Sequence, residues 1–435
     1  MNPAYQLFLE QFKGKEVAII GFGVSNRPLA RLLIGAGAKV TVCDKDETVN
    51  PEDCPGAAFR LGPSYLMNLP GEVIFRTPGL RPDHPSLEKA RAEGRRVTSE
   101  MEEFFKLCPC PIIGVTGSDG KTTTTTLIAE MLGAAGITAH LGGNIGSPLL
   151  TRAGEMDAGD CAVVELSSFQ LMDMTQSPKV AVITNITPNH LDWHRDMEEY
   201  IAAKLVLLRF QGGGDTAVLN ADNPLTETLR GNGRTEYFGG FRIRDGMIDG
   251  FLPLSCIRLR GHYQTENLMA AMTAVRGMAR PEVIRSVAEN FGGVPHRNEF
   301  VKEIDGVSYY NNSIGSSPAR TAATLRAHDG KVLLIAGGRD KNVPFDDLCA
   351  LFPSHVKRLY LIGESAETIA AAALAVPGAP DAIRCADLED AVLQAKRDAK
   401  PGDTVLLSPA CTAFDAYKNF EERGKHFVEI VHKLR

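Results

Sequence analysis

Apolar and polar positions in the first hundred residues alternate in short runs, which is typical of a parallel sheet covered by helices. Apolar runs at 16–20, 39–44 and 73–75 predict strands, and the stretch that ends at about Ala36 predicts a helix. A helix-length segment, rather than a tight turn, separates the first two strands. The strands are therefore expected to be parallel.

Two further blocks repeat this alternation. Between residues 110 and 294, strands are predicted at 111–116, 161–165, 180–185 and 217–220, and helices at about 197–210 and 267–278. The segment 239–259 predicts short strands and turns. From about Pro295 onward, strands at 332–336, 359–363 and 404–408 alternate with Ala-rich helices, which indicates a second Rossmann-like unit.

The start of the second block carries a glycine-rich loop between a predicted strand and a predicted helix. Its residues are Gly117, Ser118, Asp119, Gly120, Lys121, Thr122 and Thr123. Glycines let backbone N–H groups turn onto phosphate oxygens, and the helix N-terminus adds partial positive charge. The lysine would reach the outer phosphates and Thr122 would bind Mg²⁺. Val115 stands where the strict spacing has glycine, so an ordinary turn is the alternative.

The whole chain is therefore predicted to be an α/β protein of three domains. A Rossmann-like N-terminal domain spans 1–100, and a central P-loop ATPase-like domain with a parallel or mixed sheet spans 101–294. A Rossmann-like C-terminal domain spans 295–435. A chain of this length holds more than one hydrophobic core.

Composition narrows the function classes. The 435 residues are 44% hydrophobic and 23% charged, with a net charge of -6 and interspersed signs. This balance argues against nucleic acid as the main partner. No leader pattern and no membrane-length apolar run is present, so no membrane insertion is expected. Nine scattered cysteines suggest reduced thiols in the cytoplasm, and the pair in Cys108-Pro-Cys110 lacks a partner pair at metal-site spacing.

Polar groups follow the predicted strands, where open α/β sheets bind ligands. Gly21-x-Gly23 is followed by Asn26 instead of a third glycine, and Asp44 lies where a ribose-binding acid belongs. A UDP-type ligand and a plain turn both remain open for this block. Glu165 is predicted to be either a Mg²⁺ ligand or a strand-end carboxylate that faces solvent.

Two other residues, His190 and Lys204, can be interpreted either as functional or as ordinary structural or surface residues. His190 follows a strand end, and its neighbours favour a functional role over a structural one. Lys204 lies on a predicted helix, and the pattern around it is that of a solvent-facing charge.

Six motifs then occur in one order along the chain. They are 116–123, Gly142-Gly-Asn-Ile-Gly146, Glu165-Leu-Ser-Ser-Phe-Gln170, Asn189-His-Leu-Asp192, Ala202-Ala-Lys204 and Pro295-His-Arg297. In this order they resemble the Mur ligases, the ATP-dependent amide ligases of peptidoglycan precursor synthesis. Within that family the run 408–424, together with Thr77-Pro78-Gly79, resembles the members that add D-glutamate.

The resemblance implies a reaction. ATP phosphorylates the L-alanine carboxylate of UDP-N-acetylmuramoyl-L-alanine, D-glutamate attacks the acyl phosphate, and a tetrahedral intermediate collapses to the amide. ATP and Mg²⁺ are the implied cofactors, the two substrates are the implied small-molecule partners, and a monomer is expected. Such phosphoryl transfer depends mainly on charge neutralisation.

The resemblance also implies site residues. Lys121, His190 and Lys204 would be catalytic, with Lys204 carbamylated, and metal ligands would be Thr122, Glu165, His190 and Lys204. ATP would meet residues 117–123, Asn267 and Arg297. The UDP-substrate would meet Gly23, Val24, Ser25, Asn26, Asp44, Thr77, Pro78, Gly79 and Asn144. D-glutamate would meet Lys341, Ala413, Phe414 and Phe420.

The chain departs from the family pattern at a few positions. Asn312 and Ile314 stand where many members have Asp and Lys, Tyr263-Gln264 replaces His-Asn, and Asp46 replaces an arginine.

Two other function classes compete with a Mur ligase. One is a nicotinamide-dependent oxidoreductase that uses Gly21-x-Gly23, and the other is a non-catalytic nucleotide switch. A nearer rival is folylpolyglutamate synthase, which shares the central domain.

Overall fold

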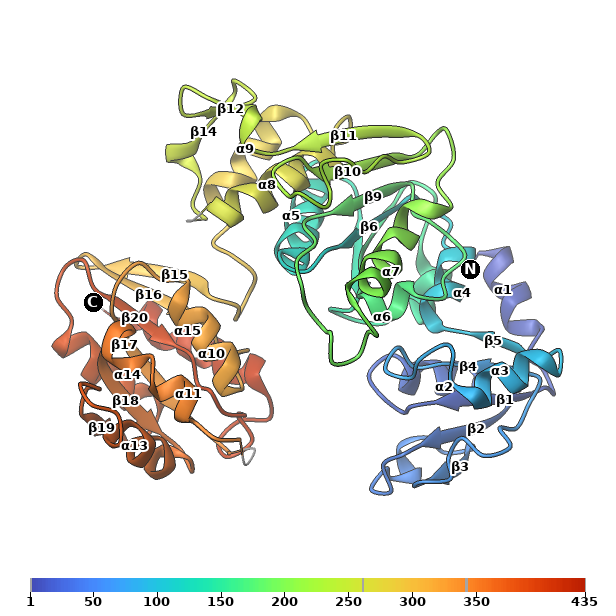
Figure 1. Cartoon of the computed structure of the whole chain (residues 1–435), viewed down its shortest axis with the longest axis horizontal. Coiled ribbons are helices and arrows are strands. Elements are labelled where there is room, and N and C mark those ends of the chain that lie inside the picture. Colours follow the sequence, from blue (N-terminus) through green and yellow to red (C-terminus); the bar gives the residue numbers. More distant parts are fainter. Residues whose placement is uncertain (1, 260–261, 341–342, 435) are drawn as a thin grey trace. The chain divides into compact units, whose positions relative to one another are not determined.

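The computed structural model describes residues 2–259, 262–340 and 343–434, which form two compact units, 1–291 and 292–435. The first unit holds two large sheets and the second holds one (Figure 1). Because the units are separate bodies, each is described by itself. No helix among the described residues has the length and apolar character that a bilayer crossing requires.

The first sheet is fully parallel in the order β3-β2-β1-β4-β5. Its strands are β1 (Glu16–Ile20), β2 (Lys39–Asp44), β3 (Ala58–Leu61), β4 (Val73–Phe75) and β5 (Arg96–Thr98). Its helices are α1 (Pro3–Glu10), α2 (Asn26–Gly35), α3 (Pro85–Ala92) and α4 (Glu100–Leu107), with the 3₁₀ turn η1 (Pro51–Asp53). The sequence pattern predicted β1, β2 and β4 and missed the edge strands β3 and β5, whose short runs lack a continuous apolar stretch.

The second sheet is also fully parallel, in the order β11-β10-β9-β6-β8-β7. Its strands are β6 (Ile112–Thr116), β7 (Ala139–Gly143), β8 (Cys161–Glu165), β9 (Val180–Ile183), β10 (Thr216–Asn220) and β11 (Arg234–Phe238). Ile112 and Ile113 of β6 belong to different core clusters, because successive side chains point to opposite faces of a strand. Both faces are therefore buried, as parallel sheets require.

Helices and a small subsheet complete the first unit. The helices are α5 (Lys121–Ala134), α6 (Ser168–Leu171), α7 (Met197–Arg209), α8 (His262–Ala274) and α9 (Pro281–Asn290), with η2 (Leu150–Glu155), η3 (Gly240–Arg242) and η4 (Leu254–Cys256). The short strands β12 (Ile243–Arg244), β13 (Met247–Ile248) and β14 (Leu252–Pro253) pair antiparallel. The helix predicted at 267–278 was placed wrongly, because the polar residues 262–266 already belong to α8 and the chain leaves the helix after Ala274.

The second unit contains a six-stranded sheet in the order β15-β16-β20-β17-β18-β19, antiparallel only between β15 and β16 within the described strands. Its strands are β15 (Glu299–Ile304), β16 (Val307–Asn311), β17 (Val332–Gly337), β18 (Val356–Ile362), β19 (Ala382–Arg384) and β20 (Thr404–Leu407). Its helices are α10 (Pro318–Arg326), α11 (Asp346–Cys349), α12 (Phe352–His355), α13 (Ala366–Leu374), α14 (Leu388–Asp398) and α15 (Phe420–Lys433). The hairpin β15–β16 was not predicted, whereas β17, β18 and β20 were.

Candidate active site

The glycine-rich loop joins the end of β6 to the start of α5, as the sequence predicted. Gly117 has φ +148°, and a Cβ placed on it would lie 1.9 Å from Thr184 Oγ1. Gly120 has φ +79°, in the left-handed region that side chains rarely adopt. Both positions therefore require glycine, and the loop directs its backbone into the N-terminus of α5, where anions bind.

Lys121 and Thr122 occupy the first turn of α5. Lys121 Nζ donates to the carbonyl oxygens of Gly117 and Ser118, each at 2.9 Å, so the ammonium lies over the loop. Thr122 is buried. This arrangement places a cation and a hydroxyl where the phosphates of a nucleotide would enter.

Asn267 of α8 lies against the same loop. A Cβ on Gly120 would stand 2.0 Å from Asn267 Oδ1. Thr124 Oγ1 donates to that oxygen at 3.4 Å, and Asn267 Nδ2 donates to Gln264 Oε1 at 3.2 Å. The structure thus brings this residue to the phosphate loop, 147 positions away in sequence from Gly120.

Glu165 ends β8 beside the phosphate strand, because Val115 of β6 pairs with it in register. Its Oε1 accepts a hydrogen bond from Asn144 Nδ2 at 2.9 Å. Its Oε2 is buried and has no hydrogen-bond partner among the described residues. A buried carboxylate oxygen without a donor is costly, and it fits a hard cation such as Mg²⁺.

The sequence pattern indicated that Lys204 faces solvent. In the structure only 2% of its surface is exposed. Its Nζ donates to Gly117 O at 2.7 Å and to Thr116 Oγ1 at 3.5 Å. Burial, followed by the nearby Lys121 charge, lowers the pKa of Lys204 to about 7. The hypothesis of a solvent-facing charge is wrong, because packing of α7 on β6 turns this side chain inward.

His190 lies in the exposed loop between β9 and α7, with φ +54°. Its ring packs edge-on against Phe169 at 5.0 Å and lies 6.5 Å from the ring of Tyr200. No group of three or more His, Cys, Asp and Glu residues gathers for a metal within the described ranges. A cation here would therefore draw ligands from hydroxyl groups, substrate phosphates or a modified lysine.

The first sheet brings together the predicted substrate loops. A Cβ on Gly21 would lie 2.9 Å from Thr77 Cβ, so the loops after β1 and β4 touch. Asp44 Oδ2 accepts the Phe22 backbone N–H at 2.6 Å. The amide of Asn26 is buried and donates to Ile20 O and Gly21 O. Asp44 and Asn26 therefore also shape the loop that carries Gly23, Val24 and Ser25.

The second unit carries the remaining candidates. Arg297 follows His296, whose φ is +63°. Ala413 is buried and Phe414 is 59% exposed. Phe420 begins α15, and its carbonyl accepts Ser313 Oγ at 2.7 Å. Lys341 lies outside the described residues.

Two residues at this site, Tyr200 and His194, were not predicted from the sequence. Tyr200 shares a hydrogen bond of 2.9 Å with Ser118 Oγ, and Lys204 Nζ lies 4.6 Å from its ring centre. His194 is buried, and its Nε2 lies 2.9 Å from Ser168 Oγ. The spacing of four between Tyr200 and Lys204 on one helix was a usable signal, because such residues share a helix face.

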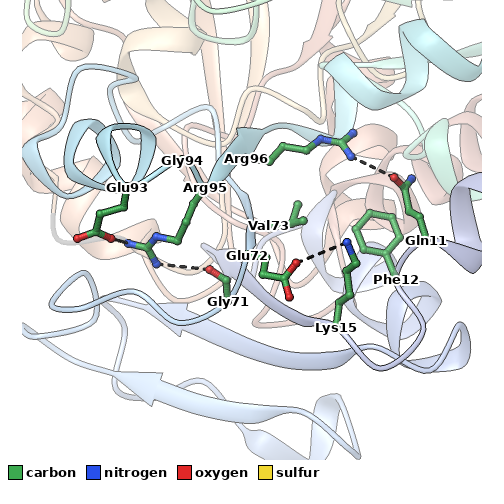
Figure 2. A pocket seen from close by; sticks show the side chains of 10 residues that line it. All are labelled: Gln11, Phe12, Lys15, Gly71, Glu72, Val73, Glu93, Gly94, Arg95 and Arg96. Atoms are coloured by element: carbon green, nitrogen blue, oxygen red, sulfur yellow. Dashed lines mark hydrogen bonds and ion pairs between the residues drawn. The ribbon is translucent and has the colours of Figure 1, made fainter.

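A separate cavity of about 430 Å³ opens at the amino-terminal edge of the first sheet, near the starts of β1, β4 and β5 (Figure 2). Its cations already have partners. Lys15 pairs with Glu72 at 3.5 Å, Arg95 with Glu93 at 2.9 Å, and Arg96 with Glu103. The predicted substrate residues lie at the opposite, carboxyl edge of the strands, so this cavity is separate from them.

Comparison with known proteins finds related sequences along the chain. A family model described as the Mur ligase middle domain matches residues 115–240, and one described as the Mur ligase, glutamate ligase domain matches 296–411. UDP-N-acetylmuramoylalanine–D-glutamate ligases of Clostridium tetani and Acetivibrio thermocellus are 43% and 46% identical to the chain, covering 100% of both sequences in each case.

Two solved structures share the fold at low identity. A UDP-N-acetylmuramate-alanine ligase from Thermotoga maritima aligns with a TM-score of 0.54 and 18% identity, covering 96% of this chain and 99% of its own. A MurF ligase from Thermotoga maritima, solved with ADP, aligns with a TM-score of 0.53 and 16% identity, covering 100% and 99%. From the two matching domains and the full-length identity of these relatives, the chain belongs to the Mur ligase family.

Proposed function

We propose that this chain is the ATP-dependent ligase that adds D-glutamate to UDP-N-acetylmuramoyl-L-alanine in peptidoglycan precursor synthesis. The observation that carries the proposal is the 41–46% identity, over the full length, to relatives that bear this activity in their names. The buried lysine beside the phosphate loop supports it, because neither a nicotinamide oxidoreductase nor a simple nucleotide switch accounts for that lysine.

In this proposal, each of the three domains predicted from the sequence binds a different ligand. The loops around Gly23 and Thr77 in residues 1–100 bind the UDP-substrate, and residues 101–294 bind ATP. Residues 295–435 bind D-glutamate through Lys341, Ala413, Phe414 and Phe420. Arg297 contacts the nucleotide and Asn144 the substrate. The assignment of Asn267 to the nucleotide is supported by its packing on Gly120.

The charges near the phosphate loop suit phosphoryl transfer. Lys121 neutralises the oxygens of the transferring group, since positioning and charge stabilisation dominate this chemistry. Glu165, Thr122 and His190 would hold Mg²⁺, and the unpartnered Glu165 Oε2 fits that role. Bound Mg²⁺ supplies further neutralisation of phosphate charge.

Lys204 fits a carbamate. Carbamylation joins CO₂ to the neutral amine with release of a proton, and the pKa of this lysine is lowered to about 7, so much of it is neutral near physiological pH. The product is an anion that would replace a cation with an oxygen donor beside Thr116 and Gly117.

We also propose that the protein acts in the cytoplasm as a monomer.

Phosphate release tests the function directly. Purified protein is supplied with ATP, Mg²⁺ and UDP-N-acetylmuramoyl-L-alanine, and each amino acid is added in turn. D-glutamate is expected to start turnover, with L-glutamate, L-lysine and diaminopimelate inactive. Turnover without any amino acid, or equal rates with L-lysine or diaminopimelate, would overturn the proposal. Identification of the amide product by mass spectrometry completes the test.

A further inference from the structure

Two arginines follow β4, and both reach from the first sheet to residues in or next to helices α6 and α7 of the second. The first, Arg76, is fully buried and pairs with Asp173, which follows α6. Its Nη1 donates to Thr77 O at 3.1 Å and to Leu80 O at 2.7 Å, and its Nη2 donates to Phe169 O at 3.3 Å. This side chain therefore binds carbonyls of the segment after β4 and the Phe169 carbonyl of α6 at once.

The second arginine, Arg81, binds the segment that carries His190. Its Nη2 and Nη1 donate to the two carboxylate oxygens of Glu199, at 2.7 and 3.1 Å. Nη1 also donates to Trp193 O at 3.0 Å, and the guanidinium lies 5.0 Å from the ring centre of Trp193. The other edge of the guanidinium donates to Asp83 at 2.9 and 3.0 Å. Paired bonds of this kind fix orientation as well as distance.

Ring and backbone contacts connect the loop after β9 to the same region. The ring of Phe169 packs on both His190, at 5.0 Å, and Trp193, at 4.5 Å. The indole N–H of Trp193 donates to Gly79 O at 3.5 Å. The backbone hydrogen bonds of His190 are local: its N–H donates to Asn189 Oδ1 at 2.9 Å, and its carbonyl accepts the N–H groups of Trp193 and His194. The His190 ring is thus linked to Trp193 through the Phe169 ring that both contact and through the hydrogen bond from Trp193 N–H to His190 O.

Electrostatics strengthen the same contact. Arg81, then a backbone bond from Arg195, hold the pKa of Glu199 down to about 2. Glu199 is thus a carboxylate at every physiological pH, and its partner Arg81 is 24% exposed. An ion pair with little exposure and bidentate geometry is worth more than an isolated surface pair.

We propose that Arg81 is a positioning residue, which fixes the His190 loop of the second sheet to the substrate loop Thr77-Pro-Gly79 of the first. The inference rests on the proposed function, in which His190 would hold Mg²⁺ and the Thr77-Pro-Gly79 loop would bind the UDP-substrate. Since a misplacement of about 1 Å can cost a hundredfold in rate, loss of this tie lowers kcat and raises KM for the UDP-substrate. The phosphate loop is not touched, so ATP affinity is retained.

The chain offers a direct probe, because Trp193 is its single tryptophan. In Arg81→Gln the indole loses the cation that covers it, and its fluorescence emission is expected to shift to the red without any substrate present. The matched control is Arg195→Gln, since Arg195 is 67% exposed and also pairs with Asp83 and Glu199. This control is expected to leave the emission and the rate within about twofold of wild type.

Kinetics with a double-mutant cycle complete the test. Arg81→Gln and Glu199→Gln are each expected to lower kcat at least about tenfold, and the double variant is expected to be no worse than either, because both remove one interaction. Arg81→Lys should recover only part of the loss, as lysine cannot make the paired bonds. ATP affinity and melting temperature of Arg81→Gln are measured alongside.

The outcomes separate the two proposals. Wild-type protein that fails to turn over with D-glutamate overturns the proposed function, while the fluorescence comparison still decides whether Arg81 seats Trp193. Active wild type with an unchanged kcat and KM in Arg81→Gln overturns the inference alone. A parallel loss of ATP affinity and melting temperature also overturns it, since that result would show a general structural role.

Discussion

Replacing Lys204 by methionine should raise stability at low pH while abolishing activity. Methionine keeps the length of the buried side chain and removes its amine. In the protein, the pKa of Lys204 falls from 10.5 to about 7, chiefly through burial. At about 1.36 kcal/mol per pKa unit, this corresponds to about 5 kcal/mol for placing the ammonium at that position. The buried Lys204 ammonium thus lowers the free energy of unfolding, and the methionine variant lacks this destabilisation.

Part of that cost is offset in the wild type. The hydrogen bonds to Gly117 O and Thr116 Oγ1 contribute about 1 kcal/mol each, and the variant leaves the Gly117 carbonyl without this donor. The expected net gain for Lys204→Met is about 1–3 kcal/mol in the free energy of unfolding below pH 7.

The gain should depend on pH in a defined direction. The folded protein has the lower pKa, so between pH 7 and 10.5 the unfolded chain binds more protons. Wild-type stability therefore rises with pH across that window relative to the variant. The advantage of Lys204→Met is largest below pH 7 and disappears toward pH 10.5.

Urea unfolding at pH 6.5 and pH 9.5 in carbonate-free buffer measures this difference. Lys13→Met, at an exposed position far from the phosphate loop in sequence, controls for the loss of a lysine. Phosphate release is measured in parallel, where the variant should be inactive because it cannot form a carbamate. A stability change that is equal at both pH values, or full activity of Lys204→Met, would refute the reasoning.

Three other outcomes follow from the same structure. Lys121→Ala should lower kcat at least about a hundredfold while melting remains cooperative; a near-normal rate would remove the loop from the phosphate site. Gly120→Ala should weaken ATP binding at least about tenfold in calorimetry, because its Cβ would meet Asn267 Oδ1 at 2.0 Å at a φ of +79°. Burial raises the pKa of Glu100 to about 7, so its stabilising contribution is present below pH 4.5 and lost as pH rises through 7. Glu100→Gln should therefore gain about 1–3 kcal/mol at pH 8 relative to pH 4.5, as measured by denaturant unfolding.

The sequence by itself determined the features that are local. The strand, glycine loop and helix around Lys121 lie within about two dozen consecutive residues, and φ at Gly117 and Gly120 explains why those residue types stand there. The central strands β6, β8 and β9 were predicted because buried parallel strands are continuous apolar runs. Short edge strands such as β5 and the hairpin β15–β16 lack that pattern.

Tertiary structure alone decided which of these pieces meet. Lys204 lies 88 positions from Thr116, and Arg81 lies 118 positions from Glu199. Packing of α7 on β6 brings Lys204 to Thr116, and Arg81, which follows β4 of the first sheet, reaches Glu199 at the start of α7. A helical lysine has the same local sequence whether it faces water or a core. Its burial, and hence its lowered pKa, arises only when the sheet and helix pack.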